Sequence, residues 1–532
     1  MQFVKAYLIL FTLLGCYTTS ANSQEKGNAL VRIKQGELSG SLELQKQVRA
    51  FKGIPYAAAP VGDLRWQPPQ QAAVWHGTRN AQYFGHKCMQ NPMFSDMQFR
   101  DAGTSEDCLF LNVWTPAKKA KNLPVLVYFY GGGFAAGDGS EKRYDGANMA
   151  KQGIVTVTVN YRLGIFGLFA HPQLSTDSGY QGSGNYTFMD QAAALKWVSE
   201  NIQSFGGDPK RVTIAGESAG SFSVSALMAS PLSRQYINGA IGESGSFLAG
   251  RLNSLEVAEK KGEEVAKSIL SGLKLSAKDT ISALKELSAQ ELLDAATKAK
   301  HVWFTANVDN YVIPKTLTQM YAQGDYAKVP LLAGNNSQEG SYQSVLGNRS
   351  ATVENYKQAL EARYPNIYGK MLELYPAKNE EQVKDAAQAI ASDEFISLST
   401  WNWMDLVTQT NSQATFFYNY THVRPLMKAE YWSNSWKQSA ARGATHSAEI
   451  EYALGNLDIN PLYEWKEQDY KVSKIVQQYF ANFIKTGNPN GKGLANWPMF
   501  KHNQQLIINN APFAENVDYL RVRYTGLNKL KN

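Results

Sequence analysis

The sequence of 532 residues predicts an α/β fold with a mostly parallel central sheet. Short apolar runs, of the kind that buried parallel strands produce, alternate along the chain with longer helical stretches. One run ends in three glycines and another in a serine between two glycines, so tight turns follow at least two of the strands. The strand-like runs are 125–130, 154–161, 212–215, 239–242, 331–334 and 415–420.

The length exceeds that of most single domains, although α/β enzymes with insertions over one sheet reach it. The segment from Glu256 to Lys300 is amphipathic and rich in Ala, Leu, Lys and Glu. This pattern predicts helical decoration of the sheet and not a separate domain. We therefore expect one domain over residues 25–532.

The charge pattern excludes one class of partner. The formal net charge of +7 comes from charges interspersed along the chain and not from a basic block. No nucleic-acid partner is therefore expected.

The N-terminal segment has the pattern of an export signal. Lys5 precedes an apolar run from Ala6 to Gly15, which is too short to span a bilayer and has the length of a signal-peptide core. We therefore predict a signal peptide over residues 1–24 and export of the mature chain, so that the protein is secreted or periplasmic.

The site of cleavage stays open between two positions, before Cys16 and near Ala21. The residues Leu13-Leu14-Gly15-Cys16 resemble a bacterial lipobox, in which the cysteine is lipidated and becomes the mature N-terminus. Cleavage before Cys16 predicts a lipoprotein anchored to a membrane, whereas cleavage near Ala21 predicts a free secreted protein.

The strand-like run Val125–Tyr130 ends in the glycines of Gly131–Phe134. Residues without side chains bring backbone N–H groups close to a ligand. In acyl transfer, such donors bind the oxygen of the tetrahedral intermediate, which carries negative charge only transiently. The run therefore indicates an oxyanion hole.

The strongest local signal is Ile214–Gly220, in which Ser218 lies between two glycines directly after the short β-type run Arg211–Ile214. This is the pattern of a nucleophile elbow, a tight strand-to-helix turn that exposes the serine oxygen above the sheet. Residues Ser221–Met228 can continue as the helix that the motif requires. Ser218 is therefore the candidate nucleophile.

These residues resemble the type-B carboxylesterases, also called the carboxylesterase and cholinesterase family, within the α/β-hydrolase superfamily. The resemblance runs nearly end to end and implies the α/β-hydrolase fold, with helices flanking a mostly parallel sheet and helical insertions over the active site. It implies that the single domain is a catalytic one that hydrolyses carboxylic esters. Besides the two motifs above, the matching segments are 51–57, 64–69, 106–113, 160–162, 184–185, 189–191, 206–209, 481–483, 486–490 and 497–498.

In this fold the catalytic residues follow the order nucleophile, acid, histidine. The first carboxylate after the late strand-like run 331–334 is Glu339, which matches the position of the acid in the family. Of the histidines that follow Glu339, His446 lies in the segment Gly443–Tyr452, which matches the segment of the catalytic histidine. The resemblance therefore implies a triad of Ser218, Glu339 and His446.

The resemblance further implies the usual roles of such a triad. His446 takes the proton of Ser218 as the serine attacks the ester, an acyl-enzyme forms, and water then releases the acid. The N–H groups of Gly132, Gly133 and Ala219 are expected to form the oxyanion hole. No metal or organic cofactor is expected.

Four further residues have roles that only the resemblance implies. Glu217 and Ser244 are expected to lie around the triad and support it. Cys88 and Cys108 match the first disulfide of the family, a bond that agrees with export from the cytosol. A eukaryotic origin would make the asparagines of four N-x-S/T triplets possible glycan acceptors, namely Asn185, Asn335, Asn348 and Asn419.

The substrate is expected to be a small-molecule ester. Cholinesterases carry a tryptophan in the first disulfide loop that binds a quaternary ammonium group, and 89–107 contains none, although Phe94 and Phe99 could partly replace it. A choline ester is therefore not expected. Aromatic residues in regions that line the pocket of relatives suggest an apolar acyl or alcohol group, namely Trp303, Phe304, Trp401 and Trp403.

Two other classes of function remain open at this point. The first is a non-catalytic adhesion or binding module of the neuroligin type, against which the intact Ser218, Glu339 and His446 argue. The second is an amidase, thioesterase or transacylase that uses the same triad. Only the leaving group or the acceptor distinguishes this second class from an esterase.

Overall fold

The computed structural model describes residues 26–531 except 44, 46, 251, 277, 300–302 and 432–440. The expected signal peptide over residues 1–24, with both of its cleavage positions at Cys16 and Ala21, lies outside the described residues. Within the described part, no helix combines the length and the apolar character needed to cross a membrane.

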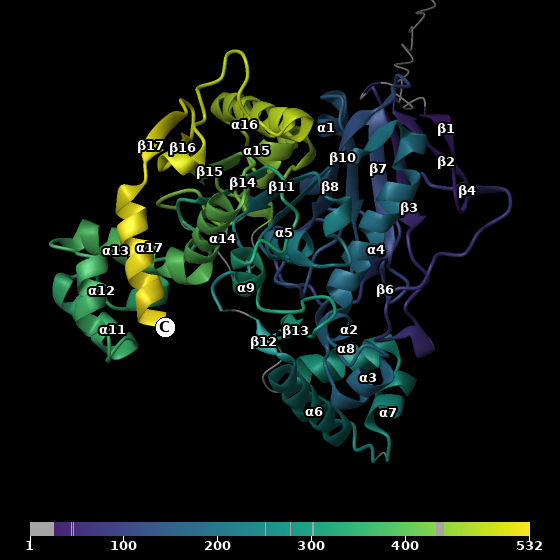
Figure 1. Cartoon of the computed structure of the whole chain (residues 1–532), viewed down its shortest axis with the longest axis horizontal. Coiled ribbons are helices and arrows are strands. Elements are labelled where there is room, and N and C mark those ends of the chain that lie inside the picture. The colour runs from purple at the N-terminus through teal and green to yellow at the C-terminus, as the bar shows by residue number, and fades with distance from the viewer. Residues whose placement is uncertain are drawn as a thin grey trace, which may run out of the picture.

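A large twisted sheet of 13 strands runs across the molecule (Figure 1). Its centre is parallel, in the order β9, β8, β10, β11, β14, β15 and β16, while antiparallel strands extend both edges. The predicted α/β fold with a mostly parallel sheet is therefore confirmed. The strands are β1 (Lys26–Ile33), β2 (Gly36–Glu43), β3 (Val48–Pro55), β4 (Thr78–Asn80), β7 (Phe110–Pro116), β8 (Leu123–Phe129), β9 (Val155–Val159), β10 (Gly207–Glu217), β11 (Gly239–Glu243), β14 (Leu331–Asn336), β15 (Thr415–Tyr420), β16 (Gln504–Ile508) and β17 (Phe513–Asn516).

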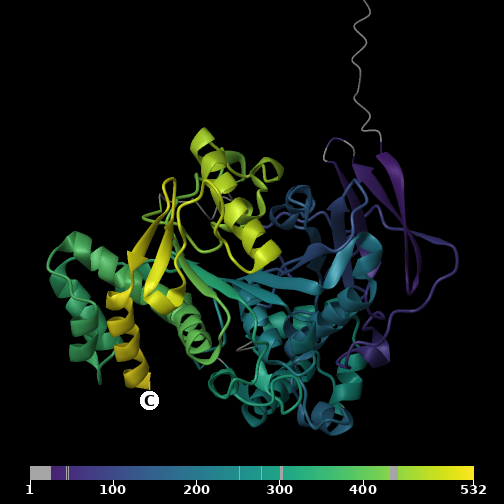
Figure 2. The ribbon, with the colours of Figure 1, turned by 45° about the horizontal axis from the view of Figure 1, so that its top comes forward.

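Helices cover both faces of the sheet, so its central strands are buried on both sides. Every residue of β9 is buried, as are Pro124 to Phe129 of β8, and such strands read in the sequence as continuous apolar runs. One face packs against α1 (Ala147–Lys151) and α16 (Glu467–Thr486), and the other against α4 (Tyr186–Asn201), α5 (Ala219–Ala229) and α14 (Leu398–Thr410) (Figure 2).

The described residues of the segment 256–300 are mostly helical, as predicted. The segment forms three helices at one end of the molecule, α6 (Leu255–Gly272), α7 (Thr280–Glu286) and α8 (Ala289–Lys298) (Figure 1). Side chains cap their N-termini, and Ser288 and Glu291 form a reciprocal capping box at the start of α8. A second helical group, at the left in Figure 1, contains α11 (Val353–Arg363), α12 (Tyr368–Leu374), α13 (Glu380–Ser392) and α17 (Asp518–Lys531).

The carboxyl ends of the parallel strands meet at one edge of the sheet, where ligands of open α/β sheets bind. Gly131–Gly133 follow β8, Ser218 follows β10, Ser244 follows β11 and Glu339 follows β14. The topology therefore brings together residues that lie up to about 200 positions apart in the sequence.

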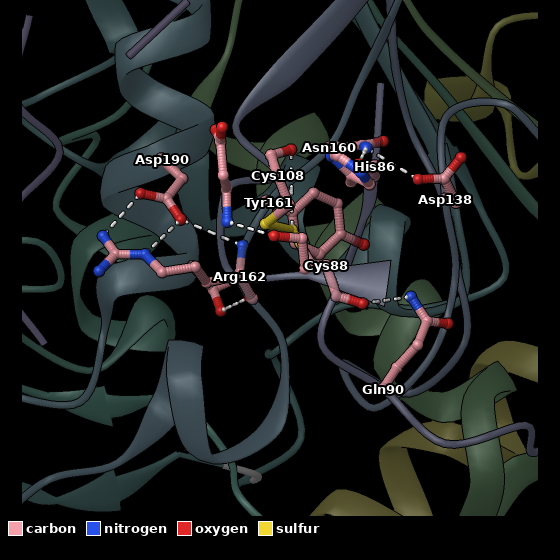
Figure 3. The surroundings of a disulfide bond; sticks show 12 residues. His86, Cys88, Gln90, Cys108, Asp138, Asn160, Tyr161, Arg162 and Asp190 are labelled. Carbon is pink, nitrogen blue, oxygen red and sulfur yellow. Dashed lines mark hydrogen bonds and ion pairs between the residues drawn. A yellow bond between two sulfur atoms is a disulfide. The ribbon is translucent and has the colours of Figure 1, made fainter. Parts of the chain in front are cut away.

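Cys88 and Cys108 form a disulfide with a Cα–Cα distance of 4.9 Å (Figure 3). The implied pairing is therefore present. Nearby, Arg162 binds the buried carboxylate of Asp190 through two hydrogen bonds of 2.7 and 2.8 Å. The disulfide closes the loop 89–107. Within this loop, the side chain of Gln90 donates to the carbonyl oxygen of Cys88 at 3.0 Å.

The structure excludes two of the glycan acceptors. Asn185 and Asn335 are buried in the fold, and the side chain of Asn185 donates to the carbonyl oxygen of Asn307 at 2.8 Å. A glycan at either position would require the core to open, so the expectation for these two residues is wrong. Asn348 is exposed and Asn419 is half-buried.

We predict that replacing Cys88 and Cys108 together with alanine lowers the free energy of unfolding by about 3 kcal/mol, because the bond restricts a loop of this length in the unfolded chain. Urea unfolding of the oxidised parent and the double variant measures the difference. A thiol reductant should lower the stability of the parent and leave the variant unaffected. Equal stability of the two proteins would contradict the prediction.

Candidate active site

Ser218 lies on a tight turn between β10 and α5. Its backbone has φ 53° and ψ −119°, a combination that costs a residue with a side chain of the order of 1–3 kcal/mol. The turn is held by the neighbouring strand β11, because the Ser218 N–H donates to the carbonyl oxygen of Glu243 at 2.9 Å. The side chain of Ser218 faces a cavity.

Two glycines make this turn possible. A Cβ on Gly216 would lie 2.6 Å from the carbonyl oxygen of Phe129 and 2.5 Å from the carbonyl carbon of Gly220. A Cβ on Gly220 would lie 2.0 Å from the same Phe129 oxygen. Only residues without side chains allow α5 to begin this close to β8.

His446 is oriented by Glu339. Its Nδ1 atom lies 2.6 Å from Glu339 Oε2, a distance typical of a strong, charge-assisted hydrogen bond. The two loops that carry these residues are joined by a backbone bridge between Gln338 and Thr445, and the Gln338 N–H donates to the carbonyl oxygen of Ala444 at 2.8 Å. The separation of acid and histidine is thus fixed by main-chain pairing.

The second oxygen of Glu339 is also fully used. Glu339 Oε1 accepts from the Ser244 hydroxyl and from the Asn336 N–H, each at 2.6 Å. Asn336 in turn donates from its side chain to Glu449 Oε2 at 2.5 Å. Glu339 is therefore held in one orientation by donors from two strand ends.

The other edge of the imidazole faces Glu217. His446 Nε2 lies 3.2 Å from Glu217 Oε1, and in the described part of the chain no hydrogen bond joins Nε2 to the Ser218 hydroxyl. Both side chains line the same cavity as Ser218. Catalytic hydrogen bonds are often formed only when the substrate is bound, so this arrangement is compatible with proton transfer from serine to histidine.

The electrostatics of the site follow from its burial. Burial alone would lower the pKa of His446, but Glu217 and Glu339 favour its charged form and raise the pKa to about 10. Burial raises the pKa of Glu217 to about 8, although His446 opposes this shift. Burial and the nearby Glu339 raise the pKa of Glu449 to about 7. The protonation of each of these groups therefore depends on the charge of the others.

The glycines after β8 lie beside Ser218. Gly132 and Gly133 have φ of 109° and 63°, in the region that favours glycine, and the N–H groups of Ala135 and Ala136 donate to the carbonyl oxygen of Gly132 at 3.1 Å. Gly132, Gly133 and Ala219 all line the cavity. Ala219 is the first residue of α5, so its N–H has no acceptor within the helix.

The cavity above Ser218 has a volume of about 540 Å³, and several aromatic rings form part of its walls. Phe134, Phe222 and Phe247 line it and pack on one another, with ring centroids 4.9 Å apart for the closest pair. Phe94 and Trp303, which are 43% and 62% exposed, also line it. Such a surface binds apolar groups.

The other aromatic residues expected at the pocket lie elsewhere. Phe304 packs against Phe169, with ring centroids 6.4 Å apart. Trp401 packs against Phe417 and other rings of the core, and Trp403 is completely buried. The expectation that these three residues line the pocket is wrong, because α14 turns both tryptophans toward the sheet.

The structure adds residues that sequence reasoning did not single out. Asn336 donates to Glu339, and Glu449 accepts from the side chain of Asn336. The ring of Phe395 packs on His446 with centroids 5.0 Å apart. Asp96 and Arg143 line the cavity and form an ion pair of 3.0 Å. Only Glu449 carried a signal, because it lies three residues after the candidate histidine.

Among the residues that the structure describes, no group of three or more His, Cys, Asp or Glu side chains is arranged to hold a metal ion.

Comparison with known proteins finds relatives of this chain in both sequence and structure. The profile of the carboxylesterase family matches residues 27–521. The fumonisin B1 esterase of Sphingopyxis macrogoltabida is 34% identical, over 93% of this chain and 89% of its own. The para-nitrobenzyl esterase of Bacillus subtilis (strain 168) is 32% identical, over 92% and 96%. A solved structure of a PNB esterase superposes with a TM-score of 0.78 at 29% identity, over 94% of this chain and 99% of that one.

We predict that Gly220→Ala destabilises the protein by about 3 kcal/mol, because the new methyl group would overlap the carbonyl oxygen of Phe129. Gly369→Ala is the matched control, since a Cβ on this glycine of α12 meets nothing within 4 Å. It should be neutral or slightly stabilising. Urea unfolding of both variants provides the measurement, and similar stabilities would refute the steric argument.

Proposed function

The chain belongs to the carboxylesterase family, and on this basis we propose that it hydrolyses carboxylic esters with Ser218 as nucleophile, His446 as general base and Glu339 as the acid that orients the histidine. As a member of this family it is a carboxylic ester hydrolase. The observation that carries the proposed triad is the 2.6 Å contact between His446 Nδ1 and Glu339, with His446 and Ser218 lining the same cavity.

In the first half of the proposed reaction, Ser218 Oγ attacks the carbonyl carbon of the ester and its proton passes to His446 Nε2. The tetrahedral intermediate collapses when the C–O bond to the alcohol breaks, and the alcohol leaves with the proton from His446. An acyl-enzyme on Ser218 remains. Glu339 stays ionised and stabilises the imidazolium through Nδ1.

In the second half, a water molecule gives its proton to His446 and attacks the acyl carbon. The bond to Ser218 Oγ breaks, the proton returns to the serine and the carboxylic acid is released. In both halves the N–H groups of Gly132, Gly133 and Ala219 bind the oxygen that becomes negative. Each such donor contributes about 3–4 kcal/mol to lowering the barrier.

We propose esters with an apolar acyl or alcohol group as substrates. The aromatic part of the cavity wall supports this, since Phe134, Phe222 and Phe247 offer no polar group to a substrate. Among the relatives, the names fumonisin B1 esterase and para-nitrobenzyl esterase indicate different esters, so family membership alone does not select one. Ester, thioester and amide substrates of the same acyl group distinguish an esterase from an amidase or thioesterase with the same triad.

We also propose that the chain is exported, on the support of the N-terminal pattern at Lys5 and 6–15 and of the disulfide between Cys88 and Cys108. Lipidation of Cys16 is the proposed anchor if cleavage takes place before this residue. Mass spectrometry of the mature N-terminus distinguishes a lipidated Cys16 from cleavage near Ala21.

We predict that Ser218→Ala lowers kcat/KM for short-chain p-nitrophenyl esters at least about 10⁴-fold, because the acyl-enzyme can no longer form. Initial rates are compared at equal concentrations of folded protein. Gly369→Ala, in α12 and outside the cavity lining, serves as the control for handling and should retain parental activity. Residual activity close to that of the parent would exclude Ser218 as the nucleophile.

We predict that Trp303→Ala lowers kcat/KM about 10-fold for esters with bulky apolar groups and much less for p-nitrophenyl acetate, because the exposed ring lines the cavity beside Gly133. A series of p-nitrophenyl esters of increasing acyl length measures the change. Tyr83→Ala, an exposed aromatic residue outside the cavity, is the control. A uniform loss along the series would show that Trp303 does not select the substrate.

A further inference from the structure

In the described part of the chain, three buried glutamates act on the candidate histidine and a fourth lies beside two of them, and the proposed mechanism uses only one of the four as an anion. Glu339 orients His446, Glu217 lies 3.2 Å from its other nitrogen, and Glu449 shares Asn336 with Glu339. The fourth is Glu243, the last residue of β11, which has no exposed surface at all. We call these four residues the carboxyl cluster.

Glu243 is built into the base of the nucleophile turn. Its carbonyl oxygen accepts the Ser218 N–H, and the next residue, Ser244, donates to Glu339. Its side chain has one hydrogen bond, which the Tyr128 hydroxyl donates to Oε1 at 3.1 Å. Oε2 is buried without a hydrogen-bond partner. Within the described part of the chain, no cation forms an ion pair with Glu243.

Among the residues that the structure describes, the neighbours of Glu243 do not supply a positive charge. Tyr128 reaches it from β8 and Glu217 from the end of β10, while Tyr418 of β15 and Glu449 before α15 are the other titratable groups around it. A buried carboxylate with one neutral donor and two acidic neighbours is strongly disfavoured relative to the protonated acid. Burial, Glu449 and Glu217 accordingly raise the pKa of Glu243 far above its ordinary value.

We propose that Glu243 is a positioning residue that stays protonated in the working enzyme and so limits the negative charge that acts on His446. The inference rests on the proposed role of His446 as general base. A base must be uncharged to accept the proton of Ser218, and each ionised carboxylate nearby stabilises the imidazolium instead. A neutral Glu243 leaves the orienting charge to Glu339, while its backbone supports the serine turn.

The stability of Glu243→Gln tests the protonation state without any measurement of activity. A carboxyl that is protonated when folded and ionised when unfolded makes the protein less stable as the pH rises above the ordinary glutamate pKa, toward the raised pKa of the folded state. The glutamine cannot ionise, so it removes this loss. The thermal midpoint of Glu243→Gln relative to the parent should therefore rise between pH 6 and pH 9, by up to about 4 °C.

Glu361→Gln, an exposed glutamate of α11, is the matched control and should follow the parent at every pH. If the midpoint of Glu243→Gln does not rise relative to the parent, or falls, Glu243 is ionised in the folded protein and the proposal is overturned. Glu243→Met, an uncharged side chain of similar length, replaces the glutamine variant if that variant does not fold, and the same relative rise is expected.

The pH dependence of kcat/KM tests the link to His446. If Glu243 is already neutral, Glu243→Gln should leave the apparent pKa of the acidic limb within about 0.3 unit of the parent. An ionised Glu243 would stabilise the imidazolium, and its removal would lower that apparent pKa by about one unit or more, which overturns the proposal. Glu217→Gln provides the positive control, since it removes a carboxyl 3.2 Å from the ring.

The two experiments separate this proposal from the proposed function. Thermal unfolding reports on Glu243 in a Ser218→Ala background as well as in the parent, because it needs no turnover. If esterase activity survives Ser218→Ala while the midpoint of Glu243→Gln rises as expected, the proposed triad fails and the protonated glutamate stands. If activity requires Ser218 but the midpoint does not rise, the triad stands and the role of Glu243 is refuted.

Discussion

The close approach of α5 to β8 is the constraint on which the site depends. Gly216 and Gly220 let the helix begin against the carbonyl oxygen of Phe129, and this contact holds Ser218 in a backbone conformation that it would not adopt alone. The surrounding sheet maintains this strained conformation, because its central strands are buried on both faces and resist local adjustment. The serine is thus placed by packing and not by its own side-chain contacts.

Once the serine is fixed, the remaining groups are placed by strand ends and by main-chain pairing. Glu339 follows β14, and the bridge between Gln338 and Thr445 brings the histidine loop to it. The cost of this construction is electrostatic, because several carboxyl groups become buried near one imidazole. The protonation states of these carboxyl groups therefore help to determine the charge of the imidazole.

Much of the fold and of the candidate site could be predicted from the sequence, because the information was local. The apolar runs marked the parallel strands, and the glycines around Ser218 marked a turn that few other residues permit. Asn336 and Glu243 were not predicted, since their roles arise from strands that are distant in sequence and adjacent only in the sheet. Trp401 was misplaced because a position near the pocket in sequence does not fix the direction in which a helix presents its side chain.

The disulfide between Cys88 and Cys108 lets the wall of the cavity vary separately from the residues proposed for catalysis. Residues 94, 96 and 97 of this loop form part of the cavity wall, while the ends of the loop are held 4.9 Å apart at their Cα atoms. Substitutions at exposed positions of the loop, such as Phe94, can therefore change the cavity wall while the strands that hold Ser218 stay the same. Natural selection can therefore change which substrates enter the site without changing the residues proposed to react with them. The disulfide allows this because it fixes the two ends of the loop.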